Sequence, residues 1–439
     1  MSLPIRYTLP QRPATVAAIG IAAYYFGRQN RDLANLFGGR ANFDKWAGII
    51  FNIHAAEALA MLVYTLYRGA DLVTAERIPT RSACHLHTRI RKMESIKHTI
   101  AENLGVAPTL SGDPHKLVDT QYQFELEQVG DLSGKVALVT GGSEGIGFGC
   151  THTLLKAGIS KVFVMSMSEE IISQAKDAFD KDEELPQDAA SRIVWKRCDL
   201  MDWKHVQQVG REITNETDRL DIFIANAGKG IMKYALDRHG IDSHMSINHL
   251  GHVVLIDAIL PLLQQTTQKF QTKVRLVSLS SNLAAQTPKE TEFDTEEDFK
   301  TDIGPQPLYG RSKLANLLFI RYLNRKYSLE GDHTDVIFNA CHPGIVETRQ
   351  SEVWIHEPFP ILGYGMNLIN PIKKDIFQGS VSAMYCATQP TKGGNFICPP
   401  AIPEDGPEKS RDEDMQDRLA RLSKQVIERA GVTLTTIPV

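Results

Sequence analysis

The sequence has few cysteines and little net charge, and each shortage excludes a class of protein. The six cysteines are widely scattered with no C-x-x-C pair, which excludes a dense disulfide framework and predicts reduced, mostly buried intracellular thiols. The formal net charge is only −4, so composition gives no reason to expect nucleic acid as a partner. At 439 residues, with 42% hydrophobic and 23% charged residues, the chain is an ordinary folded protein with more than one domain.

The sequence also has no convincing metal site and no P-loop. Cys84, His85 and His87 come nearest to a zinc site, but no second ligand pair follows at the required spacing. We therefore predict no bound metal. The glycine-rich turn described below is not followed by the Gly-Lys-Ser/Thr of a P-loop, and neither an internal repeat nor a low-complexity tract is present.

Short β-branched runs alternate with helical patterns through residues 131–402. The runs lie at 135–140, 161–165, 192–197, 221–225, 274–279, 335–340 and 394–398. This alternation is typical of βαβ units, so we predict an α/β fold with a Rossmann-type, doubly wound parallel sheet. From residue 403 an acidic, proline-containing link leads to an amphipathic pattern at 412–430, which predicts a C-terminal helix in segment 403–439.

A glycine-rich turn, VTGGSEGIG at 139–147, separates the first run from the first helical pattern. Gly141, Gly145 and Gly147 would let the backbone approach a ligand closely, and the helix amino terminus offers unpaired N–H groups. This combination suits a pyrophosphate. Taken alone, the turn could also serve only to pack the helix on the sheet.

Further motifs follow in order at the ends of the predicted strands. They are the Cys-Asp-Leu ending at Leu200, the Asn-Ala-Gly of 226–228, the INHLGH of 247–252, the LVSLSS ending at Ser281, the Y-x-x-x-K of Tyr309 and Lys313, and HPGIVET at 342–348. With the glycine turn, this series resembles the short-chain dehydrogenase/reductase family across about 131–400. Open α/β sheets bind ligands at these strand ends.

The resemblance implies a dinucleotide site and assigns residues to it. Asp199 would hold the adenine amine, and the Asn-Ala-Gly segment would line the cofactor. The complete set of cofactor-binding candidates is Gly141, Ser143, Gly145, Ile146, Gly147, Asp199, Leu200, Asn226, Ala227, Gly228, Tyr309, Lys313, Pro343, Gly344, Val346 and Thr348.

The catalytic candidates are Ser281, Tyr309, Lys313 and Asn248. Tyr309 and Lys313 are four positions apart and share one face of a helix, so the ammonium should lower the tyrosine pKa and allow proton exchange with a substrate oxygen. Ser281 would orient that oxygen; strand alternation favours it over Ser280. By resemblance, Asn248 lies at a helix distortion and supports a water-mediated proton path to Lys313.

The substrate class is implied only by a sub-family resemblance. The long acidic insertion between Ser281 and Tyr309, the following YGRSKLANLLF, the MYCAT of 384–388 and the closing helix resemble the retinol-dehydrogenase-like branch. The resemblance implies a small lipophilic alcohol or carbonyl compound as substrate. The hydride would pass to or from a nicotinamide.

The choice between NADP and NAD is open in the sequence. The end of the second run carries neither the acid of a typical NAD site nor the arginine typical of the branch. Ser166 and Ser168 could bind a 2′-phosphate, whereas Glu169 or Glu170 could reach a ribose. We favour NADP and keep NAD as the alternative.

The amino-terminal region 1–130 is expected to be helical and membrane-associated. Residues 46–67 are long enough to cross a hydrocarbon layer, whereas the apolar run 14–26 is short for that purpose. Arginines and lysines after residue 67 suit a cytosolic flank, which would leave the catalytic domain facing the cytosol from an endoplasmic reticulum or mitochondrial membrane. A buried helix pair on the catalytic domain and, for residues 1–31, a mitochondrial presequence are the alternatives. No signal peptide is predicted.

Two function classes follow from these observations. The first is an NAD(P)-dependent oxidoreductase, and the second is a non-catalytic member of the same fold that binds a dinucleotide as a sensor or scaffold. The intact Ser281, Tyr309 and Lys313 favour the enzyme, because a sensor needs no proton donor. A homo-oligomer is left open.

Overall fold

The computed structural model describes residues 122–344, 346 and 375–439. Its centre is an eight-stranded sheet in the order β3-β2-β1-β4-β5-β6-β7-β8, parallel except for the antiparallel pair β7 and β8. The strands are β1 Val136–Thr140, β2 Lys161–Ser166, β3 Ile193–Arg197, β4 Ile222–Ala225, β5 Val274–Leu279, β6 Val336–Cys341, β7 Phe396–Cys398 and β8 Ile402–Glu404. The seven runs found in the sequence are β1 to β7, which confirms the predicted α/β fold.

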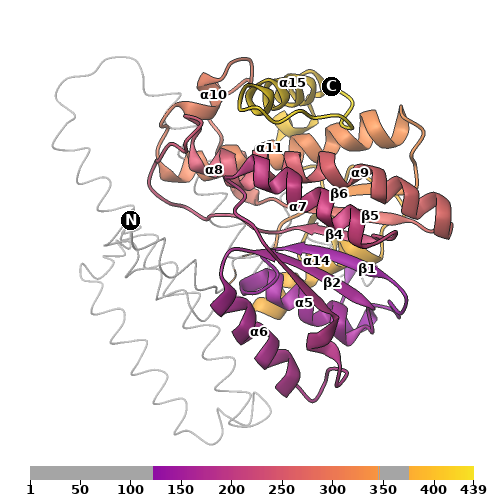
Figure 1. Ribbon diagram of the computed structural model, residues 1–439. Coiled ribbons are helices and arrows are strands. Elements are labelled where there is room, and N and C mark those ends of the chain that lie inside the picture. Colours follow the sequence, from indigo (N-terminus) through magenta and orange to yellow (C-terminus); the bar gives the residue numbers. More distant parts are fainter. Residues whose placement is uncertain (1–121, 345, 347–374) are drawn as a thin grey trace, which may run out of the picture. The chain divides into compact units, whose positions relative to one another are not determined.

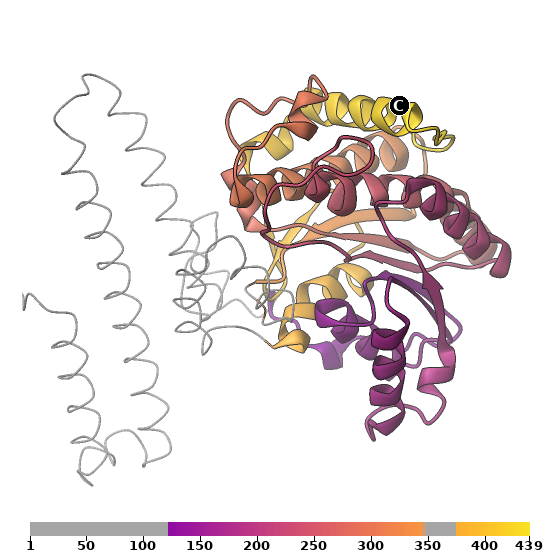
Figure 2. The ribbon, with the colours of Figure 1, turned by 60° about the vertical axis from the view of Figure 1, so that its left-hand side comes forward.

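Helices cover both faces of the sheet, as Figures 1 and 2 show. One face carries α5 (Gly145–Lys156), α6 (Glu169–Lys181) and α14 (Ile376–Thr388), and the other carries α7 (Trp203–Glu216), α9 (Gly251–Phe270) and α11 (Pro305–Leu323). Each group of helices shares a separate apolar core with its face of the sheet. Because both faces are covered, the central strands are buried along their length, as parallel strands usually are.

Short helices complete the connections between these elements. Those before β5 are η3 Leu126–Gln128, η4 Ala189–Arg192, α8 Ser243–Met245 and the π-helix η5 Ser246–Leu250. Those after it are η6 Asn282–Gln286, α10 Glu297–Lys300, the π-helix η7 Asn324–Leu329 and η9 Glu408–Arg411. The longer helix α15, Glu413–Arg429, follows η9. The C-terminal helix predicted at 412–430 is α15, with Asp412 as its amino-terminal cap.

The strand β8 was not predicted. Residues 402–404 sit in a stretch rich in proline and acids, which the sequence indicated as a link. They pair with β7 through Phe396 and Glu404, Ile397 and Pro403, and Cys398 and Ile402. Proline is tolerated here because β8 is the last strand of the sheet.

The acidic insertion between Ser281 and Tyr309 packs into the fold. Phe293 and Phe299 are fully buried, and their rings meet edge to face with centroids 6.0 Å apart. The carbonyls of Lys300 and Thr301 accept hydrogen bonds from Tyr234 and Arg311. The insertion is therefore held by apolar anchors as well as by its charges.

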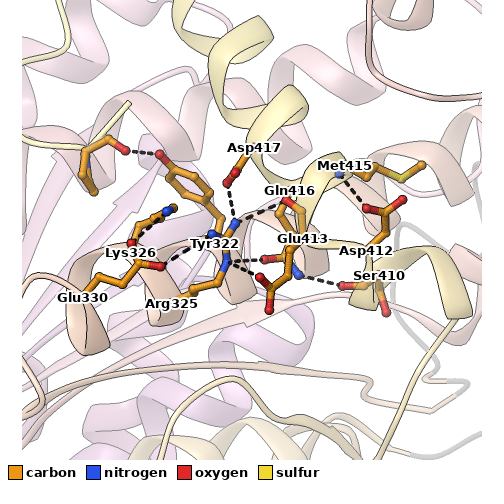
Figure 3. A network of polar contacts seen from close by, with 11 residues as sticks. Tyr322, Arg325, Lys326, Glu330, Ser410, Asp412, Glu413, Met415, Gln416 and Asp417 are labelled. Carbon is orange, nitrogen blue, oxygen red and sulfur yellow. Dashed lines mark hydrogen bonds and ion pairs between the residues drawn. The ribbon is translucent and has the colours of Figure 1, made fainter.

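The helix α15 covers α11, and a network of charges fixes it there (Figure 3). Arg325 of η7 forms ion pairs with Asp417 and Glu413 of α15 and with Glu330, the residue after η7. Arg325 Nε also donates to Gln416 Oε1 at 3.4 Å, and Gln416 Nε2 donates to the Ser410 carbonyl at 3.3 Å. The C-terminal helix is thus part of the main core.

A buried carboxylate holds the last residues of the chain. Asp257 of α9 is only 2% exposed, and its oxygens accept backbone N–H groups from Thr435, Thr436 and Ile437 at 2.7–3.1 Å. Three donors around one carboxylate compensate for the loss of water. The C-terminal tail is therefore tied to a helix that lies far earlier in the sequence.

One helix within the described residues is long and apolar enough to cross a membrane. It runs from Ser243 to Phe270 and combines α8, η5 and α9, but 89% of its most apolar window is buried inside the fold. We interpret it as a core helix for that reason. The segments 14–26 and 46–67, on which the predicted membrane association depends, lie outside the described residues.

The five cysteines in the described part of the chain are free and buried, as predicted. No group of three or more His, Cys, Asp or Glu residues suited to a metal was found among the described residues. Cys84, His85 and His87 lie outside them.

Candidate active site

The glycine turn between β1 and α5 requires glycine for the packing of its own backbone. Gly141 and Gly145 have φ of 65° and 56°, a region that other residues rarely adopt. A Cβ on Gly147 would lie 2.1 Å from the Gly141 carbonyl oxygen and 2.6 Å from Asn226 Nδ2. The sequence predicted that these glycines make room for a pyrophosphate. The structure adds that the turn itself leaves no room for a side chain at Gly147.

A hydroxyl that sequence reasoning missed holds the turn against β4. Thr140 Oγ1 accepts the backbone N–H groups of Asn226 and Ala227, both at 3.0 Å, and Asn226 Nδ2 donates to the Thr140 carbonyl at 2.9 Å. The Asn-Ala-Gly segment is therefore fixed beside the glycine turn, where the resemblance places the cofactor. Thr140 was in the quoted motif, but only its neighbours were assigned a role.

His252 is a second positioning residue that was missed. Its Nδ1 lies 3.1 Å from the Asn248 carbonyl, which can only accept, so Nδ1 carries the proton and Nε2 accepts from Thr140 Oγ1 at 2.9 Å. Burial lowers the pKa of His252 to about 4, which keeps the ring neutral and this arrangement intact at physiological pH. The INHLGH motif thus supports the glycine turn as well as supplying Asn248.

Ser281 and Tyr309 come together at the carboxyl end of β5. A hydrogen bond joins their side chains, and Ser281 Oγ also caps η6 by accepting from Leu283 N at 3.2 Å. Ser280 Oγ instead donates to the Lys313 carbonyl at 2.8 Å, so its hydroxyl serves the backbone of α11. This difference favours Ser281 as the serine that orients a substrate oxygen.

Lys313 lies on the same face of α11 as Tyr309. Its Nζ is 5.6 Å from the centre of the Tyr309 ring and donates to the Leu279 carbonyl at 3.0 Å. The side chain is 5% exposed, and burial lowers its pKa to about 8. The lysine is therefore poised to lose its proton only slightly above neutral pH.

The expected lowering of the Tyr309 pKa is not found in this structure. Burial raises the pKa to about 12, and the hydrogen bond with Ser281 opposes that rise only in part. Sequence spacing could place the ammonium nearby, but it could not weigh that charge against desolvation of the phenolate. The phenol therefore keeps its proton at neutral pH, which suits a proton donor to a carbonyl.

Asn248 lies in the π-helix η5, the helix distortion that the resemblance implied. Its Oδ1 accepts Lys229 N at 2.8 Å, and its Nδ2 donates to Ser312 Oγ and to the Lys229 carbonyl, each at 3.0 Å. Gly228 is close to both catalytic candidates, because a Cβ there would lie 2.9 Å from Asn248 Oδ1 and 3.7 Å from Lys313 Nζ. Asn248, Gly228 and Lys313 therefore share one small region of the site.

The remaining cofactor candidates lie around the same sheet edge. Ser143 and Leu200 are buried, Ile146 is half-buried in α5, and Asp199 Oδ1 accepts Met201 N at 2.9 Å. Beyond β6, Gly344 has a φ of 86°, and Pro343 precedes it. Val346 is buried against Gly379 of α14, while Thr348 lies outside the described residues.

Ser166 and Ser168, which by sequence could bind a 2′-phosphate, each accept a hydrogen bond from a neighbouring group. Ser166 Oγ accepts the Trp195 indole N–H at 3.0 Å, and Ser168 Oγ caps α6 by accepting Ile171 N at 3.2 Å. Both oxygens thus have local structural roles. The sequence could not reveal the first role, because the strand register decides which side chain faces Ser166.

Comparison with known proteins agrees with the series of motifs. A family model described as short chain dehydrogenase matches residues 135–292. The Neurospora crassa protein named "Putative oxidoreductase bli-4, mitochondrial" is 43% identical over 76% of this chain and 80% of its own length. Mouse retinol dehydrogenase 14 is 30% identical over 60% of this chain and 77% of its own length. The chain belongs to the short-chain dehydrogenase/reductase family.

Membership makes this chain an NAD(P)-dependent oxidoreductase of that family, related to its retinol-dehydrogenase-like members. A crystal structure of an uncharacterized protein from Mycobacterium Paratuberculosis shares the fold, with a TM-score of 0.53 and 21% identity over 71% of this chain and 99% of the other. The predicted Rossmann-type fold is thereby confirmed a second time.

The buried ammonium of Lys313 should cost stability, and we expect Lys313→Met to stabilise the dinucleotide-free protein at pH 7. The folded-state pKa of about 8 lies below the ordinary 10.5, so the cost is complete below pH 8 and falls as pH rises from 8 toward 10.5. Burying the ammonium costs roughly 3 kcal/mol of stability. The gain on substitution is smaller than this, because Lys313→Met also loses the hydrogen bond to the Leu279 carbonyl.

Urea unfolding of both proteins between pH 7 and 9 checks this expectation. The difference in the free energy of unfolding between Lys313→Met and the wild type should become smaller over that range. The reason is that the Lys313 ammonium of the folded wild type deprotonates in this range, whereas that of the unfolded chain does not. An equal or lower stability of Lys313→Met at pH 7, with no change in the difference, would contradict the assigned cost. Turnover should be lost in either case.

Proposed function

We propose that this protein interconverts a small lipophilic alcohol and its aldehyde or ketone with NADP as cofactor, using Tyr309 as the proton donor and acceptor. The observation that carries the proposal is the joining of Ser281 and Tyr309 at the end of β5, with Lys313 one helical turn away. Similarity to a protein named retinol dehydrogenase 14 supports the substrate class.

Each residue has a distinct task in this reaction. Ser281 orients the substrate oxygen by a neutral hydrogen bond, and Tyr309 gives that oxygen its proton during reduction or removes it during oxidation. Lys313 and Asn248 return the proton through the region around Gly228. The nicotinamide, when bound, supplies or accepts the hydride.

The glycine turn fits the phosphates of such a cofactor. α5 begins at Gly145, and its first N–H groups lie at the carboxyl end of β1, where a pyrophosphate would meet the helix dipole. Hydrogen bonds of Thr140 with Asn226 and His252 hold the glycine turn in place.

The test is dinucleotide turnover with a panel of retinoids, sterols and aliphatic ketones of matched solubility. We expect absorbance changes at 340 nm with at least one lipophilic compound and none with short polar alcohols such as glycerol. Dinucleotide binding without turnover on any class would refute the enzyme and favour the sensor or scaffold. Turnover of only polar compounds would refute the lipophilic substrate class.

We further propose that residues 1–110 hold the enzyme at an intracellular membrane, with the catalytic domain in the cytosol. The apolar length of 46–67 and the basic residues after it support the proposal. Lipid would then bury this region, and the catalytic domain would not need it. The name of the Neurospora crassa relative includes the word mitochondrial, which is compatible with a mitochondrial membrane or with a presequence in 1–31.

A chain starting at Gln121 should therefore be soluble and bind dinucleotide as the full chain does. This start keeps Phe124, which is 6% exposed and packs edge to face on Tyr385 of α14 with the ring centroids 5.4 Å apart. In membrane fractionation, the full chain should require detergent and the shortened chain should not. A full chain that stays in the soluble fraction, or a shortened chain that misfolds, would indicate a helix pair belonging to the catalytic core.

A further inference from the structure

We infer that Arg197, at the end of β3, recognises the 2′-phosphate of the cofactor and so sets a preference for NADP over NAD. The inference deepens the proposed function and depends on its dinucleotide site. It assigns to one side chain a task that the sequence had given to Ser166 and Ser168.

A surface pocket of about 410 Å³ lies at the ends of β2 and β3. It is lined by Met167, Arg197, Cys198, Asp199, Asp202 and Arg238, among others. Asp199 is the residue expected to hold the adenine amine, so this pocket is where the adenosine half of a dinucleotide would lie. Ligands of open α/β sheets bind at such strand ends.

The strand register puts Arg197 beside the position where dinucleotide enzymes select their cofactor. In the parallel pair of β2 and β3, Arg197 is opposite Ser166 at the last paired position. Met167, which follows Ser166 directly, is 61% exposed and carries no group able to bind a phosphate. A 2′-phosphate at the end of β2 would therefore find its cation on the neighbouring strand.

Arg238, Asp202 and Asp237, three other charged residues of the pocket, have partners within the fold. Arg238 forms an ion pair with Asp202 at 2.6 Å. Asp237 accepts the Ser246 hydroxyl at 2.6 Å and the backbone N–H groups of His239 and Ile241. Arg197 is exposed and makes no ion pair or side-chain hydrogen bond within the described residues, so its guanidinium is free for a ligand.

The chemistry of the guanidinium suits a phosphate monoester. Its planar array of donors can bind two phosphate oxygens at once, and its charge persists at any physiological pH. Glu169 and Glu170, the acids that could have reached an unmodified ribose, do not line the pocket. The free cation and the absence of these acids both favour the phosphorylated cofactor.

The experiment compares 2′,5′-ADP with 5′-ADP, two adenosine fragments that differ in the 2′-phosphate, by calorimetry on the purified full chain. We expect the wild type to bind 2′,5′-ADP at least about tenfold more tightly, because hydrogen bonds between charged groups are the strong ones. Arg197→Gln should bind both fragments with similar affinity, and Arg197→Lys should keep part of the preference.

Arg211→Gln serves as the matched control. Arg211 is exposed on α7 and does not line the pocket, so its loss changes the net charge equally without touching the ligand. This variant should keep the full preference for 2′,5′-ADP. Wild type without a preference, or Arg197→Gln with an undiminished one, would overturn the assignment.

Binding of the fragments needs neither substrate nor turnover, which separates this inference from the proposed reaction. If the fragments bind as expected and no compound of the substrate panel reacts, the proposed reaction fails and the role of Arg197 stands. If turnover occurs but Arg197→Gln keeps the preference, only the role of Arg197 is lost.

Discussion

Tyr309→Phe is expected to lower turnover by about three orders of magnitude, because general acid–base catalysis by a positioned side chain commonly contributes 10²–10⁴-fold. The phenol is hydrogen-bonded to Ser281 and holds its proton at neutral pH, since burial raises its pKa to about 12. The remaining ring still packs on α11, so the dissociation constant for the dinucleotide should change by only a few-fold. Steady-state kinetics and calorimetry measure the two effects separately.

Tyr327→Phe is the matched control for this substitution. The Tyr327 hydroxyl is buried in η7 and has no hydrogen-bond partner among the described residues, so removing it should leave turnover unchanged. Turnover of Tyr309→Phe within a few-fold of wild type would exclude Tyr309 as the proton donor. A parallel loss in both variants would indicate a general effect on folding.

Gly147→Val should abolish dinucleotide binding, and Gly147→Ala should already weaken it at least tenfold. A Cβ at this position would lie 2.1 Å from the Gly141 carbonyl oxygen, a backbone atom, so the turn that receives the pyrophosphate must open. Overpacking of this kind typically costs about 1–3 kcal/mol of stability. Calorimetry with NADP and NAD reports affinity, and circular dichroism reports whether the variants are folded.

Gly130→Ala provides the comparison for the milder variant. Gly130 is exposed, and nothing lies within 4 Å of a Cβ added there, so binding and stability should be those of the wild type. A folded Gly147→Ala protein with normal affinity for the dinucleotide would contradict the prediction that the glycine turn binds the pyrophosphate.

The fold was predictable because buried parallel strands appear in the sequence as short runs rich in β-branched residues. The residues of β1, β4, β5 and β6 are almost all buried, and their parallel order brings the glycine turn, Asn226, Ser281 and Pro343 to one edge of the sheet. Order along the chain therefore predicted proximity in space. The strand β8 was missed because its pairing depends on β7, not on its own composition.

The sequence could not predict properties that depend on residues brought close only by the fold, such as strand register and side-chain burial. The Trp195 indole reaches Ser166 only because β2 and β3 pair in one register, and the same register brings Arg197 to that strand end. The Tyr309 pKa depends on burial, which spacing on a helix does not reveal. Arg197 was also absent from the predicted site, because only the neighbouring Asp199 belongs to a recognised motif.

The Asp257 carboxylate and its three backbone donors have a consequence for how the chain is made. α9 is a central helix, yet the N–H groups that donate to its buried Asp257 carboxylate belong to residues 435–437. Until those residues leave the ribosome, the Asp257 carboxylate lacks these three donors, so the packing around it cannot be completed. An affinity tag fused after Val439 would be separated by only Pro438 and Val439 from Ile437, whose backbone N–H is already bound by Asp257.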